Sequence, residues 1–469
     1  MIEFNNVSFT YQGKRRENGI HNVSFQIQRG EVILICGGSG CGKSTVTRII
    51  NGLIPHFYEG KLEGDFKINS ELMNNKTLYE INRNIGSVFQ NPRTQFFNLD
   101  TEGELFFGCE NRGMDTELIM RNRQDSIEKF HLEELMSRSI FKLSGGQQQR
   151  VACASAYCSE PDIFVLDEPT SNLDECSIDE LKEILATVKA SGKTIVIAEH
   201  RLYFLMDLVD RIFYMDKGEL IHIFSRKEFL DLSRQETEIM GLRSTRKTSI
   251  NELDFLGNKN HKREEFLEIH NMKAFYKDDQ EQLKEVLNIN DLKIPLGEIV
   301  AIIGNNGIGK TTFAQTVAGL QKNAKAEIYF HARKMKHKER TKLSYLVMQD
   351  VNHQLFTDSV MEEIKLGAKV PAEDIGKLLK AFELDGLKKE HPMSISGGQK
   401  QRVTIAAAIS SGKRIVILDE PTSGLDYKQM VNVSEALKEL QKKVDLILVI
   451  THDYEFINYC CTSIINMDK

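Results

Sequence analysis

The chain has 469 residues, which suggests two or three domains because one domain usually takes about 100–200 residues. Hydrophobic residues make up 41% and charged residues 27%, which excludes collagen-like, coiled-coil and wholly disordered chains. The net charge of −6 argues against a general nucleic-acid binder, which usually carries a strong basic excess. The apolar runs are too short for a membrane span and the start lacks a signal-peptide pattern, so we expect a protein that stays in the cytoplasm and crosses no membrane by itself.

The first informative segment is a glycine-rich loop between a strand-like run, Val32–Cys36, and a helix-like segment, residues 46–52. The loop has the pattern G-x-x-x-x-G-K-S and consists of Gly37, Gly38, Ser39, Gly40, Cys41, Gly42, Lys43 and Ser44, followed by Thr45. Glycines let backbone N–H groups turn inward around an anion, and the helix N-terminus adds its positive dipole end. We expect Lys43 to bridge the β- and γ-phosphates of a nucleotide and Ser44 to place its hydroxyl on Mg²⁺.

Cysteine usage indicates reduced thiols. No pair among the eight cysteines has the C-x-x-C spacing of a zinc or redox motif, and a chain in the cytoplasm keeps its thiols reduced. Cys41 is the exception of interest, because it lies inside the glycine-rich loop near backbone N–H groups that could lower the pKa of its thiol.

A fully apolar run that ends in two carboxylates, Ile163–Glu168, suits a buried parallel strand. Carboxylates at such a strand end lie where an α/β sheet opens its ligand crevice. We expect Asp167 to hold Mg²⁺, usually through water, and Glu168 to act as general base toward an attacking water. His200 ends a further strand-like run, and its spacing to the acidic pair favours a γ-phosphate sensor over a purely structural histidine.

The first unit is expected to span residues 1–223, and a linker with a possible helix residues 224–263. Ser225 can cap a helix that extends to Arg243, with apolar residues on one side. The remainder of the linker is polar and mildly basic, which favours a solvated flexible tether, with a lipid-headgroup contact as the alternative.

The second unit, residues 264–469, repeats the first in the same order. Its glycine-rich loop consists of Gly304, Asn305, Asn306, Gly307, Ile308, Gly309, Lys310, Thr311 and Thr312. The acidic pair returns as Asp419 and Glu420 and the histidine as His452, with Thr311 and Asp419 as the expected metal ligands. The offset between the repeats is 252 residues for both the acidic pair and the histidine (419−167 and 452−200), which indicates a duplicated domain.

Two further repeated segments identify a family. Leu143-Ser144-Gly145-Gly146-Gln147 and Ile395-Ser396-Gly397-Gly398-Gln399 resemble the signature of ATP-binding-cassette ATPases, and the resemblance covers nearly the whole chain outside the linker. It implies an α/β fold with two tandem P-loop NTPase domains, each with a mostly parallel sheet core, an antiparallel β subdomain and a helical subdomain. It also implies that Ser144 and Gly146, like Ser396 and Gly398, meet a phosphate at a helix N-terminus.

The same resemblance implies how the sites are assembled. Each signature serves the other cassette, so Lys43 would face Ser396 and Lys310 would face Ser144 in two composite ATP sites. Tyr11 and Tyr276 hold the place where the family stacks an aromatic ring on adenine, with a core or surface tyrosine as the alternative.

Gln90 and Gln349 match the glutamine that approaches Mg²⁺ and relays to a transport partner. The segment from Gln90 to Phe97 resembles the Q-N-P-x-x-Q-hydrophobic pattern of energy-coupling factor (ECF) transporter ATPases, and Gln349 begins a looser version. Arg201 after His200 also resembles that subfamily, whereas the second unit has the commoner Thr451-His452-Asp453.

In that subfamily two ATPases drive a transmembrane scaffold and a small substrate-binding membrane protein. Acidic residues after the two glutamines could meet basic helices of the scaffold, or form a solvated helical face; they are Asp100, Glu102, Glu104, Asp358, Glu362 and Glu363. We therefore expect a peripheral protein at the cytoplasmic face of the cell membrane, with membrane contact through its partners and no nucleic acid.

The function expected from the sequence is ATP hydrolysis with ATP and Mg²⁺, coupled to import of a vitamin, a vitamin precursor or a metal ion. One alternative is a soluble tandem-cassette ATPase that acts on ribosomes, although such proteins usually carry a longer and more highly charged linker. The other is a tandem sugar-importer ATPase, in which one site is commonly degenerate, whereas both sites look intact here.

Overall fold

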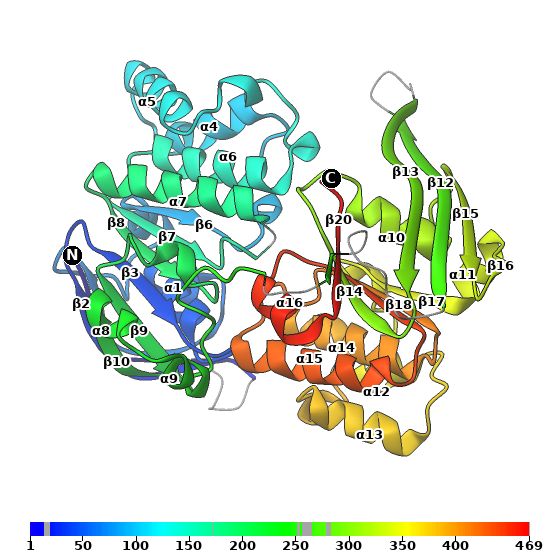
Figure 1. Ribbon diagram of the computed structural model, residues 1–469. Coiled ribbons are helices and arrows are strands. Elements are labelled where there is room, and N and C mark those ends of the chain that lie inside the picture. The colour runs from blue at the N-terminus through cyan, green and yellow to red at the C-terminus, as the bar shows by residue number, and fades with distance from the viewer. Residues whose placement is uncertain (14–18, 172, 251–253, 256–264, 278–282, 469) are drawn as a thin grey trace. The chain divides into compact units, whose positions relative to one another are not determined.

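The computed structural model describes residues 1–13, 19–171, 173–250, 254–255, 265–277 and 283–468 (Figure 1). The chain divides into two compact units. The first contains Met1–Lys247 and Asp426–Lys428, and the second contains Thr248–Leu425 and Gln429–Lys469. Each unit has one larger, mostly parallel sheet, one smaller antiparallel sheet and a group of helices, which confirms the predicted fold class.

The larger sheet of the first unit has the strand order β10-β9-β3-β8-β7-β6. Its strands are β3 (Val32–Cys36), β6 (Ile85–Val88), β7 (Ile163–Asp167), β8 (Thr194–Ala198), β9 (Arg211–Asp216) and β10 (Glu219–Ser225). All neighbouring pairs are parallel except β9 with β10. β3 and β8 are buried along their whole length, as continuous Val, Ile and Leu runs require when a sheet is covered on both faces.

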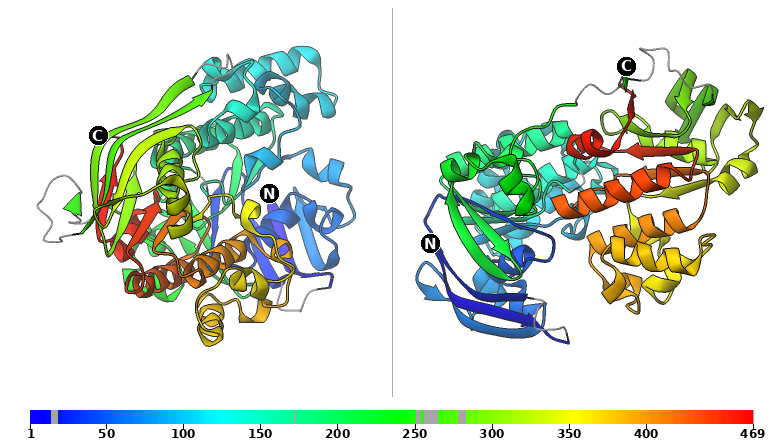
Figure 2. Two further views of the ribbon diagram at one scale, coloured as in Figure 1. Left: turned by 90° about the vertical axis from the view of Figure 1, so that its right-hand side faces the viewer. Right: turned by 60° about the horizontal axis from the view of Figure 1, so that its bottom comes forward.

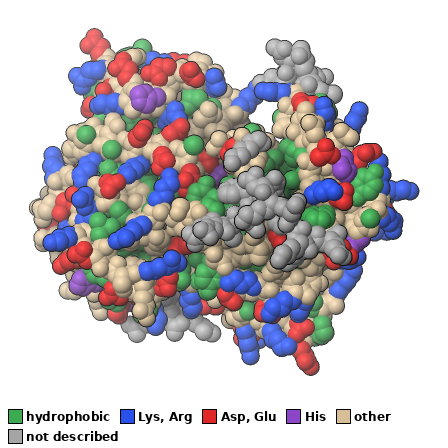
Figure 3. Space-filling view, in the orientation of Figure 1, with side chains coloured by type: hydrophobic (Ala, Val, Ile, Leu, Met, Phe, Trp, Pro, Cys, Tyr) green, Lys and Arg blue, Asp and Glu red, His purple; other side chains and the backbone are tan. Residues whose placement is uncertain are grey.

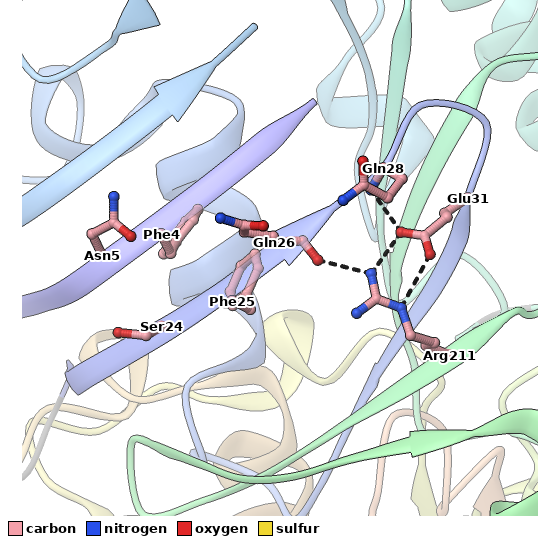
Figure 4. Close-up of a pocket in the computed structure, with 8 residues that line it drawn as sticks. All are labelled: Phe4, Asn5, Ser24, Phe25, Gln26, Gln28, Glu31 and Arg211. Atoms are coloured by element: carbon pink, nitrogen blue, oxygen red, sulfur yellow. Dashed lines mark hydrogen bonds and ion pairs between the residues drawn. The ribbon is translucent and has the colours of Figure 1, made fainter. Parts of the chain in front are cut away.

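The antiparallel sheet of the first unit has the order β2-β1-β4-β5. Its strands are β1 (Ile2–Tyr11), β2 (Gly19–Ile27), β4 (Gly60–Ile68) and β5 (Glu71–Leu72). Arg211 on β9 ties this sheet to the larger one, because its guanidinium donates to both carboxylate oxygens of Glu31, at 3.1 and 2.6 Å, and to the carbonyl of Gln26 at 2.8 Å (Figure 4). A pocket of about 520 Å³ lies beside this ion pair and is lined by Phe4, Asn5, Ser24, Phe25, Gln26, Gln28, Glu31 and Arg211.

Helices complete the first unit. They are α1 (Lys43–Ile50), α2 (Leu53–His56), α3 (Leu78–Asn82), α4 (Thr101–Asn111), α5 (Thr116–Lys129), α6 (Gly145–Cys158), α7 (Glu175–Ala190), α8 (Arg226–Leu230) and α9 (Arg234–Ile239). Single 3-10 turns are η1 (Pro92–Thr94), η2 (Glu133–Leu135), η3 (Ile140–Lys142) and η4 (Tyr203–Leu205). Helices α4, α5 and α6 group together as the helical subdomain (Figure 1).

The second unit repeats this plan with a larger sheet in the order β11-β20-β14-β19-β18-β17, in which each pair is parallel. Its strands are β11 (Asp254–Phe255), β14 (Glu298–Ile303), β17 (Ser344–Val347), β18 (Ile415–Asp419), β19 (Leu446–Ile450) and β20 (Ser463–Asn466). The antiparallel sheet β13-β12-β15-β16 consists of β12 (Phe266–Lys277), β13 (Leu283–Pro295), β15 (Ala324–Phe330) and β16 (Arg333–Lys334).

The helices of the second unit are α10 (Lys310–Ala318), α11 (His337–Leu343), α12 (Val360–Lys365), α13 (Ala372–Ala381), α14 (Gly397–Ser410), α15 (Tyr427–Gln441) and α16 (Tyr454–Cys460). The 3-10 turns are η5 (Val351–Gln354), η6 (Asp385–Leu387) and η7 (Pro392–Ser394). Within this unit α12 and α13 lie away from strands β12 and β13 (Figures 1 and 2).

The predicted linker has structure in its first half. Ser225 caps a helix as expected, but the single helix predicted up to Arg243 is two short helices, α8 and α9, each with a capping box. Phe229 and Leu242 are buried in the apolar core of the first unit, so this segment packs onto that unit. The division into residues 1–223, 224–263 and 264–469 stays a proposal, and much of residues 251–264 lies outside the described residues.

Among the described residues, no helix is long and apolar enough to cross a membrane. Lys/Arg and Asp/Glu side chains are interspersed over the face of the first unit that Figure 3 shows. This mixture agrees with the small net charge.

Candidate nucleotide-binding sites

The glycine-rich loop of the first unit connects β3 to α1, the strand–loop–helix order that the sequence predicts. Gly37 and Gly42 have φ angles of 147° and 106°, which only glycine adopts readily. A Cβ on Gly37 would also lie 2.1 Å from the carbonyl oxygen of Met215. The Lys43 ammonium donates to the carbonyls of Gly37 and Gly38 at 3.1 Å each, so its charge is held at the loop.

The loop of the second unit has the same construction between β14 and α10. Gly304, Gly307 and Gly309 have φ angles of 144°, 84° and 104°. Lys310 donates to the carbonyls of Gly304 and, at 3.0 Å, of Asn305. Both loops therefore combine a buried lysine with a helix N-terminus, which is a suitable arrangement for the phosphates of a nucleotide.

The hydroxyl that follows each lysine is paired with the strand-end aspartate of its unit. Ser44 donates to Asp167 with 3.0 Å between the oxygens, and Thr311 donates to Asp419 at 2.8 Å. Burial and the neighbouring charge of Glu168 raise the pKa of Asp167 to about 6, and burial raises the pKa of Asp419. A hydroxyl beside a carboxylate is the oxygen-only ligand set that Mg²⁺ accepts together with water and phosphate, so these residues fit that ion.

The glutamates next to these aspartates face the predicted histidines. His200 Nε2 lies 3.4 Å from Oε1 of Glu168, and His452 Nε2 lies 3.8 Å from Oε1 of Glu420. Both glutamates have a left-handed backbone, with φ of 45° and 51°. This conformation is unfavourable for residues other than glycine and is concentrated at functional sites. The structure thus brings the predicted base and the predicted sensor together in each unit.

The first of these pairs has a defined charge state. Burial opposes ionisation of Glu168, but the hydrogen bond and charge of His200, with Lys43 and Arg48, outweigh it and lower its pKa. Burial and the charge of Lys43 lower the pKa of His200. We therefore describe the pair at neutral pH as a neutral histidine beside an ionised glutamate, which can accept a hydrogen bond from water.

The two glutamines lie differently around the glutamates. Gln90 Nε2 donates to Oε2 of Glu168 at 2.8 Å, which places it beside the predicted base of the first unit. Gln349 is exposed just after β17.

Both predicted adenine-stacking tyrosines lie beside a loop threonine. The Tyr11 hydroxyl is 3.1 Å from Oγ1 of Thr45 and accepts from Arg48 at 3.2 Å. Thr312 Oγ1 donates to the Tyr276 hydroxyl at 3.5 Å. Arg48, which also stacks over the Tyr58 ring, was not singled out from the sequence because it lies outside the motif.

The signature serines cap helices. The Ser144 hydroxyl accepts from the Gln147 amide at 3.3 Å at the start of α6, and that of Ser396 accepts from the Gln399 amide at 3.4 Å at the start of α14. A Cβ on Gly146 would lie 2.3 Å from the Ser177 hydroxyl oxygen, which explains the glycine there. The pairing of Lys43 with Ser396 and of Lys310 with Ser144 stays a prediction.

Two expectations from the sequence are wrong. Cys41 is buried, and burial raises the pKa of its thiol although the Lys43 charge opposes that shift. Glu104 and Glu363 are buried rather than available to a partner, since each accepts two backbone N–H groups: Phe97 and Asn98 at 3.0 Å, and Phe356 and Thr357 at 2.9 Å. These glutamates instead hold the loops that expose Phe97 and Phe356, each 76% accessible.

The fold and the two loop sites define a tandem P-loop nucleotide-binding protein. The family model described as ABC transporter matches residues 20–171 and 287–423, one segment in each unit. A Treponema denticola protein named as an ABC transporter ATP-binding protein is 43% identical over 468 residues, which cover 99% of this chain and 95% of the relative. A Methanosarcina mazei protein with the same description is 30% identical and covers 97% of this chain and 85% of the relative. The chain therefore belongs to the ABC transporter family and is an ATPase of that family.

Solved structures with two cassettes share the fold. The RNase-L inhibitor aligns with a TM-score of 0.64 at 23% identity, over 97% of this chain and 87% of that chain. A model of ribosome-bound archaeal Pelota and ABCE1 aligns with a TM-score of 0.67 at 21% identity, over 98% of this chain and 76% of that chain. At these identities the likeness concerns the fold alone.

Proposed function

We propose that this chain is the ATP-hydrolysing energy-coupling subunit of a membrane importer. Lys43 and Lys310 bind the β- and γ-phosphates of two ATP molecules, with the backbone N–H groups of the glycine-rich loops. Ser44, Asp167 and Gln90, and in the second unit Thr311, Asp419 and Gln349, hold Mg²⁺, which when bound neutralises charge that develops on the phosphates. The hydroxyl–carboxylate pairs at 3.0 and 2.8 Å support this assignment.

In this proposal Glu168 and Glu420 orient the attacking water and accept its proton. The ionised state of Glu168 at neutral pH supports that role, because only the ionised carboxylate can accept a proton from water. His200 and His452, which lie beside these glutamates, contact the γ-phosphate. Tyr11 and Tyr276 stack on adenine.

The cassettes cooperate in the proposed mechanism. Ser144 and Gly146 complete the site of Lys310, and Ser396 and Gly398 complete the site of Lys43, so ATP favours a closed pair and release of products reopens it. Because ATP contacts the signature of the other cassette only in the closed state, its binding favours closure.

The observation that supports a membrane partner is a matched apolar face in both units. In the first unit the exposed residues are Phe97, which follows Gln90, and Phe141, which precedes Ser144. Their two segments are neighbours, because the Ile140 amide donates to the Leu99 carbonyl at 3.0 Å. The second unit exposes Phe356 and Met393 in the corresponding places. Exposed apolar residues in corresponding places of two repeats favour a protein-binding surface over scattered surface residues.

The partners are then a transmembrane scaffold and a small substrate-binding membrane protein, and this chain is peripheral at the cytoplasmic face of the membrane. The resemblance of the Gln90–Phe97 segment to ECF transporter ATPases supports this class. The cargo is a vitamin, a vitamin precursor or a metal ion.

Fractionation of cells that produce the tagged chain tests the proposal. We expect it to sediment with membranes and to co-purify with a multi-spanning protein and a second small membrane protein. If the chain sediments with ribosomes and none is bound to membranes, the result would instead support the alternative function, a tandem-cassette ATPase that acts on ribosomes. Mass spectrometry of the co-purified small membrane protein would then identify the small molecule or ion that it binds as the cargo.

A further inference from the structure

Each of the two histidines has an acidic neighbour in the sequence, but on opposite sides in the two units. The first unit has Glu199-His200-Arg201, and the second has Thr451-His452-Asp453. The acidic residue therefore precedes the histidine in one unit and follows it in the other. With the offset of 252 (452−200), Glu199 corresponds to Thr451 and Arg201 to Asp453.

In the first unit the Glu199 carboxylate joins two segments. Its Oε1 accepts from the Thr170 amide at 3.1 Å and also from the Thr170 hydroxyl. Its Oε2 accepts from the His200 amide at 2.6 Å. Thr170 lies two residues after Glu168, so one carboxylate ties the turn of the proposed base to the turn of the histidine.

In the second unit Asp453 makes the corresponding bond from the other side of the histidine. The Thr422 hydroxyl donates to Oδ2 of Asp453 at 2.7 Å, and Thr422 lies two residues after Glu420. Thr451, in the place of Glu199, donates from Oγ1 to the Glu420 carboxylate at 3.3 Å and accepts from the Asp453 amide at 3.1 Å. The carboxylate thus lies at a different sequence position in each unit, but it accepts from the corresponding threonine, Thr170 or Thr422.

Capping of the following helix is not the role that the two carboxylates share. Asp453 also caps α16, because its Oδ1 accepts from the Phe456 amide at 3.0 Å. The first unit has only the 3-10 turn η4 at that place, and Leu202 at its start makes no side-chain cap. The bond to the threonine is therefore what the two carboxylates share.

We propose that Glu199 and Asp453 are equivalent positioning residues for ATP hydrolysis, each of which holds the threonine after the base so that Glu168 stays beside His200 and Glu420 beside His452. Glu199 and Thr170 are buried, as are Asp453 and Thr422, so water does not easily replace a lost bond. Because a small displacement of a base costs a large factor in rate, the effect falls on turnover more than on ATP binding. The inference rests on the proposed role of Glu168 and Glu420 as bases.

The test moves the carboxylate within the first unit of the full chain. Glu199→Thr removes it, and Glu199→Thr with Arg201→Asp rebuilds the Thr-His-Asp pattern of the second unit. Because the second unit keeps its own base, hydrolysis is followed separately at the site of Lys43 by site-resolved nucleotide trapping. We expect kcat at that site to fall about 10²-fold in the first variant, with a smaller change in KM, and the double variant to recover most of the loss. Arg201→Ala is the matched control; it keeps Glu199 and we expect it to stay within a few-fold of the wild-type rate.

The outcomes separate the two claims. A double variant no more active than Glu199→Thr, or a Glu199→Thr variant with the wild-type kcat, would overturn the positioning role. Glu168→Gln with Glu420→Gln in the same assay tests the bases themselves: unchanged turnover there rejects the proposed base role instead. Should Glu199→Thr not fold, Thr170→Val and Thr422→Val remove the same hydroxyl bonds with little change in shape, and an unchanged kcat in both overturns the inference.

Discussion

The side chain of Gln90 donates a hydrogen bond from Nε2 to Oε2 of Glu168, with 2.8 Å between the two atoms. Gln90 begins the segment that leads to the exposed Phe97, so the bond joins the surface proposed to meet a membrane partner to the proposed base. A partner that moves this segment also changes the hydrogen bonding of Glu168. This connection provides a physical route between transport and hydrolysis in the first unit.

Replacement of Gln90 by Glu tests that connection. Two carboxyl groups at hydrogen-bond distance resist double ionisation, so we expect the pKa of Glu168 to rise. Since the base must be ionised to accept a proton, the rate of ATP hydrolysis should fall most at acidic pH and reach its maximum at higher pH than in the wild type. Gln90→Leu removes the bond without adding charge, so we expect only a smaller displacement in the same direction. Identical pH profiles of the two variants, at saturating Mg²⁺, would contradict the expectation.

The apolar faces predict a second set of variants. Phe97→Asp with Phe356→Asp places charge in the proposed interface, and we expect recovery of the membrane partners with the tagged chain to fall about 10-fold or more. ATP binding should persist because neither residue belongs to a glycine-rich loop. Met120→Asp, which places a charge on an exposed apolar residue of α5, is the matched control. Full partner recovery with the double variant would place the interface elsewhere.

Cysteine labelling follows from burial and pKa. Cys176 is exposed and the other cysteines are buried. Because the thiolate is the reactive form and burial raises the pKa of Cys41, a maleimide at neutral pH should modify Cys176 first and Cys41 slowly. Cys41 labelling should accelerate as the pH rises, and bound ATP should slow it. Peptide mass spectrometry of the wild type and of Cys176→Ser measures this, and equal labelling rates of Cys41 and Cys176 at neutral pH would refute it.

The pairing of loops and signatures is tested by Ser396→Arg and Ser144→Arg. In the proposed composite sites, Ser396→Arg should reduce nucleotide trapping at the site of Lys43 more than at that of Lys310. Ser144→Arg should have the reverse effect, and it controls for the loss of a helix cap, since both serines cap helices in the same way. Photo-crosslinking of an ATP analogue, mapped by peptide, distinguishes the sites. The opposite pattern would show that each signature serves its own unit.

Local patterns in the sequence were sufficient for the strands, the loops and the strand-end acids. β3 and β7 were predicted from continuous apolar runs, and the loops from glycine spacing, because both depend on residues close together in the chain. The helix predicted from Ser225 to Arg243 was wrong in extent, since Leu232 and Leu242 pack against the first unit and the chain turns between α8 and α9 to allow it.

The sequence by itself determined that the chain is a duplicated nucleotide-binding fold and which residues could contact phosphate, metal and water, because these depend on motifs of a few neighbouring residues. Only the tertiary structure decided that Glu104 and Glu363 are buried supports for exposed phenylalanines, that Cys41 is shielded, and that Glu199 and Asp453 hold corresponding threonines. Burial and hydrogen-bond partners arise from segments distant in the chain, and no local pattern records them.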